Sequence, residues 1–318
     1  MAEAASAQRW YGVDIGGTKI ELVACDERFE VRYRRRVDTP TQDYEAFLEA
    51  IADIVRAADE ELGDVCAAIG LGLPGVRDAV SGRQLSSNVP ALTGREVGRD
   101  LQMRLPHPLH LGNDCHCFAL SEAHGGAAEG YASMFGAIVG TGAGGGYCVD
   151  GRLIAGGNGV AGEWGHWSVP ATLLARHGLP LLDCACGLRG CMERYASGSG
   201  LALIHRHLGG ESIDASAIAA RAQAGDAVAQ RALAIHRDLL GYGLAGLVLA
   251  LDPHVIVLGG GLSKFEALYR DLPAAVAAHL FEGVRPPPIL PPKFGDAGGA
   301  RGAALLARQR SLTCSSTA

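Results

Sequence analysis

The chain has 318 residues, enough for one large or two ordinary domains, and 48% of them are hydrophobic, which supplies a buried core. The formal net charge of −6 argues against nucleic acid as a partner, because phosphate backbones are bound by clustered Lys and Arg. The longest apolar stretch, 243–259, is broken by Asp252-Pro253-His254, so we expect no membrane partner. Nine cysteines and no apparent secretory leader predict a cytoplasmic protein whose thiols serve metals or the core.

The first half of the chain predicts a sheet with one covering helix. Apolar residues at helical spacing predict a helix over 44–62, and a second helix begins near Asn113-Asp114. The strands predicted from apolar and β-branched runs are 10–15, 20–25, 29–37, 67–73 and 110–112.

The second half repeats the opening pattern of strand, glycine-rich turn and strand. The predicted elements are a strand at 133–139, a turn at 140–146, a strand at 147–149, helices between 201 and 251, a strand at 255–258 and a closing helix at 301–310. Such repetition at the level of architecture predicts two α/β domains, 1–116 plus 296–318 and 117–295, around a central cleft.

The first glycine turn, Asp14-Ile-Gly-Gly-Thr-Lys19, is suited to phosphate because glycines let backbone N–H groups approach phosphate oxygens. Asp14 at the strand end could hold a metal ion through water. Taken alone, the turn is an ordinary hairpin about as often as a phosphate site.

A second turn, Gly140-Thr-Gly-Ala-Gly-Gly-Gly146, favours the phosphate interpretation, since two such turns suit a nucleoside triphosphate held between two domains. A third run, 259–261, could pass close to the base or ribose. The residues predicted to bind the nucleotide are Asp14, Gly16, Gly17, Thr18, Lys19, Gly140, Thr141, Gly142, Gly144, Gly145, Gly260 and Gly261.

Asn113-Asp114 stands where a strand passes into a helix, and there Asn or Asp often simply caps the helix. Together with two phosphate turns, however, an Asp at this position is suited to accept a hydroxyl proton. Phosphoryl transfer needs positioning, charge neutralisation and one carboxylate that orients the attacking hydroxyl. We predict that Asp114 is the catalytic base.

One histidine and three cysteines, His166, Cys184, Cys186 and Cys191, have the spacing of a closed tetrahedral Zn²⁺ site, which indicates a structural metal. The alternative is a set of reduced core thiols. The second ring nitrogen of His166 could face a ligand. The polar residues predicted to bind a polyhydroxylated substrate are Asn88, Asn113, Asp114, Glu163, His166 and Glu193.

These elements resemble the ROK group of sugar kinases, within the actin-like ATPase (ribonuclease H-like) superfamily. The resemblance runs through nearly the whole chain and is carried by 14–19, 113–114, 140–142, 162–166, 184–193, 259–263 and 295–304. It implies an α/β fold of two domains, phosphorylation of a sugar 6-hydroxyl by MgATP, and a homodimer that closes on its substrates.

Within this group, three segments are similar to bacterial N-acetyl-D-glucosamine kinases: 88–91, 118–123 and 177–180. The resemblance therefore implies N-acetylglucosamine 6-phosphate as product. The segment 156–163 is equally similar to fructokinase and mannokinase members, so these sugars and glucose stay open. A non-catalytic sugar-binding regulator is a further alternative, although only thirteen residues precede Asp14, too few for a DNA-binding module.

Two residues depart from the pattern of the group. His116 stands where relatives usually have Asn, which predicts a different contact at the start of the helix. Ala185 stands between two cysteines where Gly is usual, and it would be strained if its φ were positive. We expect that its φ is not positive.

Overall fold

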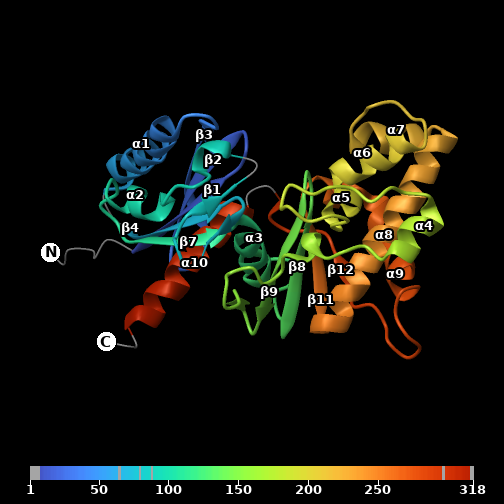
Figure 1. Ribbon diagram of the computed structural model, residues 1–318. Helices are drawn as coiled ribbons and strands as arrows, with labels where there is room; N and C mark the ends of the chain where they lie inside the picture. The colour runs from blue at the N-terminus through green and yellow to red at the C-terminus, as the bar shows by residue number, and fades with distance from the viewer. Residues whose placement is uncertain (1–7, 64–65, 79, 87–88, 296–297, 316–318) are drawn as a thin grey trace. The chain divides into compact units, whose positions relative to one another are not determined.

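The computed structural model describes residues 8–63, 66–78, 80–86, 89–295 and 298–315, and Figure 1 shows its elements. The chain divides into two compact units. Unit 1 comprises Met1–His124, Leu153–Ala161 and Asp296–Ala318, and unit 2 comprises Gly125–Arg152 and Gly162–Gly295.

Unit 1 is built on a five-stranded sheet with the order β3-β2-β1-β4-β7. β1 pairs antiparallel with β2 and parallel with β4, and β4 pairs parallel with β7. The strands are β1 (Arg9–Ile15), β2 (Lys19–Cys25), β3 (Val31–Asp38), β4 (Cys66–Leu73) and β7 (Leu109–Asn113), with a small hairpin of β5 (Val76–Arg77) and β6 (Gln84–Leu85). All five strands predicted for the first half are confirmed.

Helix α1 (Tyr44–Leu62) confirms the predicted amphipathic helix. Asp43 caps its first turn by accepting a hydrogen bond from the backbone N–H of Ala46, and Gly63 ends it with a φ of 80°. Its apolar face joins the core of unit 1. The other helices of the unit are η1 (Pro90–Leu92), α2 (Val97–Gln102), α3 (Asp114–Ala123) and α10 (Gly298–Ser315).

Helix α10 packs unusually close to the sheet. A Cβ on Gly12 of β1 would lie 1.8 Å from the carbonyl oxygen of Ala300, and one on Gly70 of β4 would lie 1.7 Å from that of Ala303. Glycine is therefore required at both positions, since any side chain would overlap with helix backbone. This packing fixes the last helix of the chain against its first strand.

Unit 2 repeats the strand order of unit 1. Its sheet has the order β10-β9-β8-β11-β12, with β8 antiparallel to β9 and parallel to β11. The strands are β8 (Ser133–Val139), β9 (Ala143–Val149), β10 (Arg152–Ile154), β11 (Val255–Gly259) and β12 (Ile289–Leu290). The predicted internal repetition is confirmed, but the predicted turn 140–146 is too long, because β9 already begins at Ala143.

The helices of unit 2 surround a large apolar core. They are η2 (Trp164–His166), α4 (Ala171–His177), α5 (Glu193–Ala196), α6 (Gly198–His207), α7 (Ala215–Gln223), α8 (Ala227–Leu251), η3 (Gly261–Lys264) and α9 (Glu266–Ala277). By length and composition alone α8 could cross a membrane, yet most of its apolar window is buried within the protein, as in the core helix of a water-soluble domain.

The compact units differ from the predicted domains in two places. Residues 117–124 belong to unit 1 because α3 packs against α10. Segment 153–161, which starts with the last two residues of β10, also belongs to unit 1, where the Nε2 atom of His116 lies 2.7 Å from the carbonyl oxygen of Ala161. His116, which stands where Asn is usual in the ROK group, thus links segment 153–161 to the start of α3.

Candidate active site

The first glycine turn is the hairpin between β1 and β2. The N–H of Gly16 donates to the carbonyl of Lys19 at 2.9 Å, and the hydroxyl of Thr39 donates to the carbonyl of Gly16 at 2.8 Å. Gly16, Gly17, Thr18 and Lys19 are all exposed. The hairpin interpretation therefore describes the backbone of this turn, while its role in phosphate binding stays a prediction.

Two carboxylates of unit 1 have raised pKa values. Burial, reinforced by the charges of Asp114 and Glu21, raises the pKa of Asp14 to about 7. Burial also raises the pKa of Asp114, against the opposing hydrogen bond from the backbone N–H of Cys115. A desolvated carboxylate with a raised pKa is suited to proton transfer near neutral pH. These properties distinguish Asp114 from an ordinary residue at a helix start.

Asn113 caps helix α3. Its Oδ1 atom accepts from the backbone N–H groups of Cys115 at 2.8 Å and His116 at 3.3 Å, and its Nδ2 donates to the carbonyl of Gly75 at 3.1 Å. The capping alternative is thus confirmed, and it fixes the side chain beside Asp114. Asn88, the remaining substrate contact predicted for unit 1, lies outside the described residues.

The second glycine turn, Gly140 to Gly142, is held from two sides within unit 2. The N–H of Gly198, the first residue of α6, donates to the carbonyl of Gly140 at 2.7 Å. The carboxylate of Glu193 accepts from the N–H of Ala143 at 3.0 Å. A Cβ on Gly142 would lie 2.5 Å from the Oε2 atom of Glu193, so a side chain there would displace this carboxylate.

A cavity of 390 Å³ opens beside this turn. It includes Gly140, Thr141 and Gly261 of the predicted nucleotide site, while Gly260 supports it with a φ of 77° where a side chain would overlap with Val139. The other lining residues belong to no sequence motif and were not predicted. They are Gly198, Ser199, Ala202, Asp214, Ala215, Ser216, Leu262 and Phe265.

Gly144 and Gly145, also predicted to bind the nucleotide, lie in β9 opposite Ile138 and Ala137 of β8 and are buried. A Cβ on Gly145 would lie 2.4 Å from the ring of Phe135. Packing inside the sheet accounts for this glycine, so the structure corrects the predicted extent of the phosphate turn.

The four predicted metal ligands come together. The nitrogen of His166 and the sulfur atoms of Cys184, Cys186 and Cys191 that could bind a metal all lie within 4.8 Å of one another. The Cys186 and Cys191 sulfurs are 3.6 Å apart, and Nδ1 of His166 is 3.8 Å from the Cys184 sulfur. With Zn–S bonds of about 2.3 Å, tetrahedral corners are about 3.8 Å apart. The donor set and its spacing therefore fit Zn²⁺.

The loop that carries the cysteines turns at glycines, as its backbone requires. Gly187 and Gly190 have φ values of 88° and 74°, whereas Ala185 is not among the described residues with positive φ. The expectation that Ala185 is unstrained is confirmed. Burial raises the pKa of Cys191 to about 12 without a metal, so binding Zn²⁺ would release protons.

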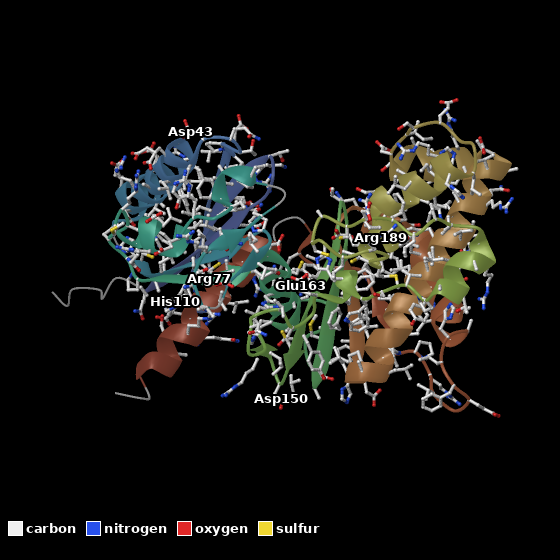
Figure 2. All side chains as sticks on the ribbon, viewed as in Figure 1. Asp43, Arg77, His110, Asp150, Glu163 and Arg189 are labelled. Atoms are coloured by element: carbon white, nitrogen blue, oxygen red, sulfur yellow. The ribbon has the colours of Figure 1, made fainter. Side chains whose placement is uncertain are left out.

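Glu163, labelled in Figure 2, pairs with His166 of the short helix η2. The Nε2 atom of His166 lies 3.8 Å from the Oε2 atom of Glu163, while its Nδ1 atom faces Cys184. One ring nitrogen thus faces the cysteines and the other a carboxylate. Glu193 follows two residues after Cys191, so the metal loop also positions the carboxylate that holds the second glycine turn.

Comparison with known proteins places this geometry in context. The model of the ROK family matches residues 10–310. The chain is 46% identical over 297 residues to an N-acetylgalactosamine kinase of Shewanella sp. (strain ANA-3), covering 93% of this chain and 96% of the relative. It is 43% identical over 300 residues to an N-acetyl-D-glucosamine kinase of Photobacterium profundum, covering 93% and 98%.

Among solved structures, the ROK hexokinase from Thermus thermophilus is similar with a TM-score of 0.86 and 34% identity, covering 96% of this chain and all of the other. A ROK family glucokinase from Streptomyces griseus, in complex with glucose and AMPPNP, gives a TM-score of 0.78 and 30% identity, covering 95% and 99%. These similarities confirm the predicted fold class.

Proposed function

The chain belongs to the ROK family, and from this premise we propose that it transfers the γ-phosphoryl group of ATP to the 6-hydroxyl of N-acetyl-D-glucosamine. The observation that carries the proposal is the half-buried carboxylate of Asp114, with its raised pKa, at the capped start of α3. Relatives described as N-acetyl-D-glucosamine kinases, 40–43% identical over 93% of the chain, support this acceptor.

In the proposed reaction, Asp114 accepts the proton of the sugar 6-hydroxyl while the oxygen of that hydroxyl forms a bond to the γ-phosphorus. The bond between that phosphorus and the bridging oxygen to the β-phosphate breaks, and ADP leaves with the bond electrons. The raised pKa makes Asp114 a stronger base than an exposed carboxylate. Asn113 holds the backbone from which Asp114 projects.

The cavity of unit 2 is proposed to hold the nucleotide. Gly140, Thr141 and Gly261 present backbone and a hydroxyl to it, without bulky side chains that would keep phosphates away. The hydroxyl groups of Ser199 and Ser216 offer hydrogen bonds, and the ring of Phe265 gives an apolar wall. In unit 1, Asp14 and the turn 16–19 are proposed to contact Mg²⁺ and the phosphates.

We assign a structural Zn²⁺ to His166, Cys184, Cys186 and Cys191, whose spacing fits its tetrahedral preference. When bound, the ion would fix the loop between η2 and α5. Glu163, the Nε2 atom of His166 and Glu193 are proposed to hydrogen-bond sugar hydroxyls, as polar side chains held by the loop.

A second acceptor, N-acetylgalactosamine, is favoured by the relative that is 46% identical. The two sugars differ only in the configuration at C4, so one hydrogen-bonding group decides between them. Fructose, mannose and glucose, the other sugars that the resemblance allows, lack the acetamido group.

We also propose that the enzyme is a cytoplasmic homodimer. Sedimentation analysis would test the dimer.

The test is ADP release with MgATP and each of these sugars. A kcat/KM highest for N-acetylglucosamine is expected, and a higher value for N-acetylgalactosamine would move the chain to the second acceptor. Asp114→Asn should lower kcat by about 10²- to 10⁴-fold. Asp53→Asn, on the exposed face of α1, is the matched control and should change nothing. An Asp114→Asn enzyme with wild-type kcat would contradict the base assignment.

A further inference from the structure

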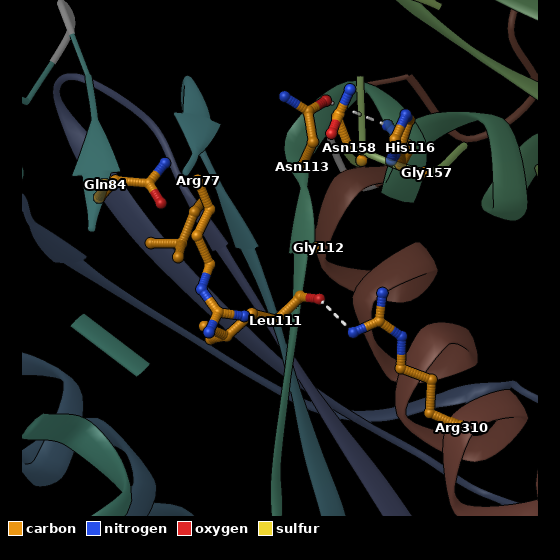
Figure 3. A pocket seen from close by; sticks show the side chains of 11 residues that line it. Arg77, Gln84, Leu111, Gly112, Asn113, His116, Gly157, Asn158 and Arg310 are labelled. Carbon is orange, nitrogen blue, oxygen red and sulfur yellow. Dashed lines mark hydrogen bonds between the residues drawn. The ribbon is translucent and has the colours of Figure 1, made fainter. Parts of the chain in front are cut away.

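Unit 1 contains a cavity of 290 Å³, and Asn113 is the only one of its lining residues to which a role in substrate binding was assigned above. It extends from the capping residue Asn113 along the edge strand β7 to helix α10 (Figure 3). Its lining comes from the ends of β4 and β7, the β5–β6 hairpin, α3, the segment 157–159 and α10. The described lining residues are Leu73, Arg77, Gln84, Leu111, Gly112, Asn113, His116, Gly157, Asn158, Gly159 and Arg310.

The charge of this cavity is one-sided. Two guanidinium groups, those of Arg77 and Arg310, line it, and none of its described lining residues is acidic. They are close enough to interact, because the pKa of Arg310 is lowered first by burial and also by the charge of Arg77. Two like charges facing one cavity in a protein of net charge −6 mark a place where an anion would be stabilised.

Both guanidinium groups are held in place by backbone carbonyls. Nη1 of Arg310 donates to the carbonyl of Leu111 at 2.8 Å, and Nε of Arg77 donates to the carbonyl of Gly82 at 3.3 Å. Figure 3 shows the two side chains approaching the Leu111–Gly112 stretch of β7 from either side. A guanidinium has five N–H donors, and a bond from one of them to a carbonyl orients the whole planar group.

The neutral polar groups of the cavity are also fixed. Nε2 of Gln84 donates to the carbonyl of Pro74 at 2.9 Å, and Nε2 of His116 lies 2.7 Å from the carbonyl of Ala161. The segment 157–159 brings two glycines and Asn158 to the rim, where backbone can approach a ligand closely. The cavity therefore has preorganised walls around its two cations.

We propose that this cavity is a binding site for a phosphate group, either inorganic phosphate or the phosphate of a small phosphomonoester. The planar fork of arginine matches the oxygens of phosphate, and two such forks offset its charge of about −2. The site uses neither Asp114 nor the cavity of unit 2. It shares only Asn113 with the acceptor residues, so an occupied site would act on the start of α3.

The test is isothermal titration calorimetry of the whole chain with inorganic phosphate, in the presence of saturating ADP and N-acetylglucosamine. Wild type should bind one phosphate per chain. Arg77→Gln and Arg310→Gln should each weaken binding about tenfold or more, as expected for loss of a charged hydrogen-bond donor. Arg77→Lys keeps the positive charge but loses the planar pair of N–H donors. Its affinity for phosphate should lie between that of the Gln variants and that of wild type.

Arg99→Gln is the matched control, because Arg99 is an exposed arginine of unit 1 that pairs with Glu96. It should bind phosphate as wild type does. Arg310 contacts the backbone of β7, so its variant could be less stable, and Arg77→Gln, an exposed site, keeps the test decisive. No heat of binding in wild type, or equal affinity in wild type and Arg77→Gln, would overturn the proposal.

A second titration with N-acetylglucosamine 6-phosphate separates the two sources of phosphate. Tighter binding than inorganic phosphate, lost in Arg77→Gln, would identify the phosphorylated sugar as the ligand, and equal binding would identify the free ion. Displacement of inorganic phosphate by N-acetylglucosamine alone would place the ion at the acceptor site and contradict a separate site. The result does not depend on turnover, so a failure of the proposed kinase activity would be seen separately.

Discussion

The two units have one strand order but support the same turn in different ways. In unit 1, the turn between the first two strands is exposed and is held by its own hairpin bond and by Thr39. In unit 2, the turn at the same topological position is held by Glu193 and by the first amide of α6, and it borders a cavity. The shared strand order therefore does not determine how each turn is held, which depends on the elements that pack against it.

The units also differ in what fixes their sheets. Unit 1 depends on backbone contact between α10 and the glycines of β1 and β4. Unit 2 has a large apolar core, close backbone contact of Gly162 and Gly165 with β9, and a loop whose four potential metal ligands lie together. Changes of one residue should therefore destabilise one unit and spare the other.

The largest effect is expected from Gly70→Ala. Its methyl group would overlap with the carbonyl of Ala303, and separating α10 from the sheet should cost more than about 3 kcal/mol. Hydrogen exchange should show lost protection in β4 but not in β11. Gly157→Ala is the control, because a Cβ there meets nothing within 4 Å, and it should keep the exchange protection of both β4 and β11. Equal protection in Gly70→Ala and wild type would contradict the close packing.

Metal removal should come next. Stripping Zn²⁺ with a strong chelator frees the loop and should lower the melting temperature of unit 2 by roughly 5–10 °C. Exchange protection should fall around Cys184 to Cys191 and persist in β1. Cys191→Ser should reproduce the effect without a chelator. Protein that contains no zinc by elemental analysis, yet shows an ordered loop, would refute the metal assignment.

Loss of the Glu193 carboxylate should weaken nucleotide binding in the absence of sugar. Glu193→Ala leaves the N–H of Ala143 without this acceptor, a loss of about 1–2 kcal/mol, or roughly 5- to 30-fold in Kd for ADP. Thr39→Val makes the corresponding change in unit 1 and should raise Kd by less than about threefold. Glu163→Ala, whose carboxylate faces His166, is the control within unit 2. If Thr39→Val had the larger effect, the comparison of the turns would be reversed.

The pH dependence of stability should single out Asp14. Its pKa is raised to about 7, so the folded chain binds a proton there that the unfolded chain has lost, and stability falls as pH rises from about 4 to 7. Without Mg²⁺, Asp14→Asn should flatten this fall, because an asparagine has no proton to lose. Urea unfolding at pH 5 and pH 8 measures it, with Asp53→Asn as control. If the free energy of unfolding changed with pH equally in wild type and in Asp14→Asn, the pKa of Asp14 would not be raised in the folded chain.

The sequence predicted the regular parts of this fold because they follow local rules. Apolar spacing marked α1, and paired apolar runs marked β1 and β2. Cysteine spacing predicted the grouping of Cys184, Cys186 and Cys191 because all three lie within one short loop.

The remaining features depend on contacts between distant residues. Arg77 and Arg310 are 233 positions apart and belong to no motif, so their shared cavity had no local signal. The strand that begins at Ala143 was hidden because three of its residues are glycines, which are typical of turns. Asp214 caps α7 and lines the unit 2 cavity, and only the first of these roles follows from its neighbours.

The contact between α10 and β1 also bears on the order in which the protein is made. Residues 9–15 leave the ribosome long before the helix that covers them, 298–315. Unit 2 can therefore complete its core before α10 is made, whereas the sheet of unit 1 keeps one face uncovered until α10 has been synthesised. During this interval the nascent chain exposes the surface that chaperones bind, so truncation before α10 should yield a protein that folds its second unit and aggregates through its first.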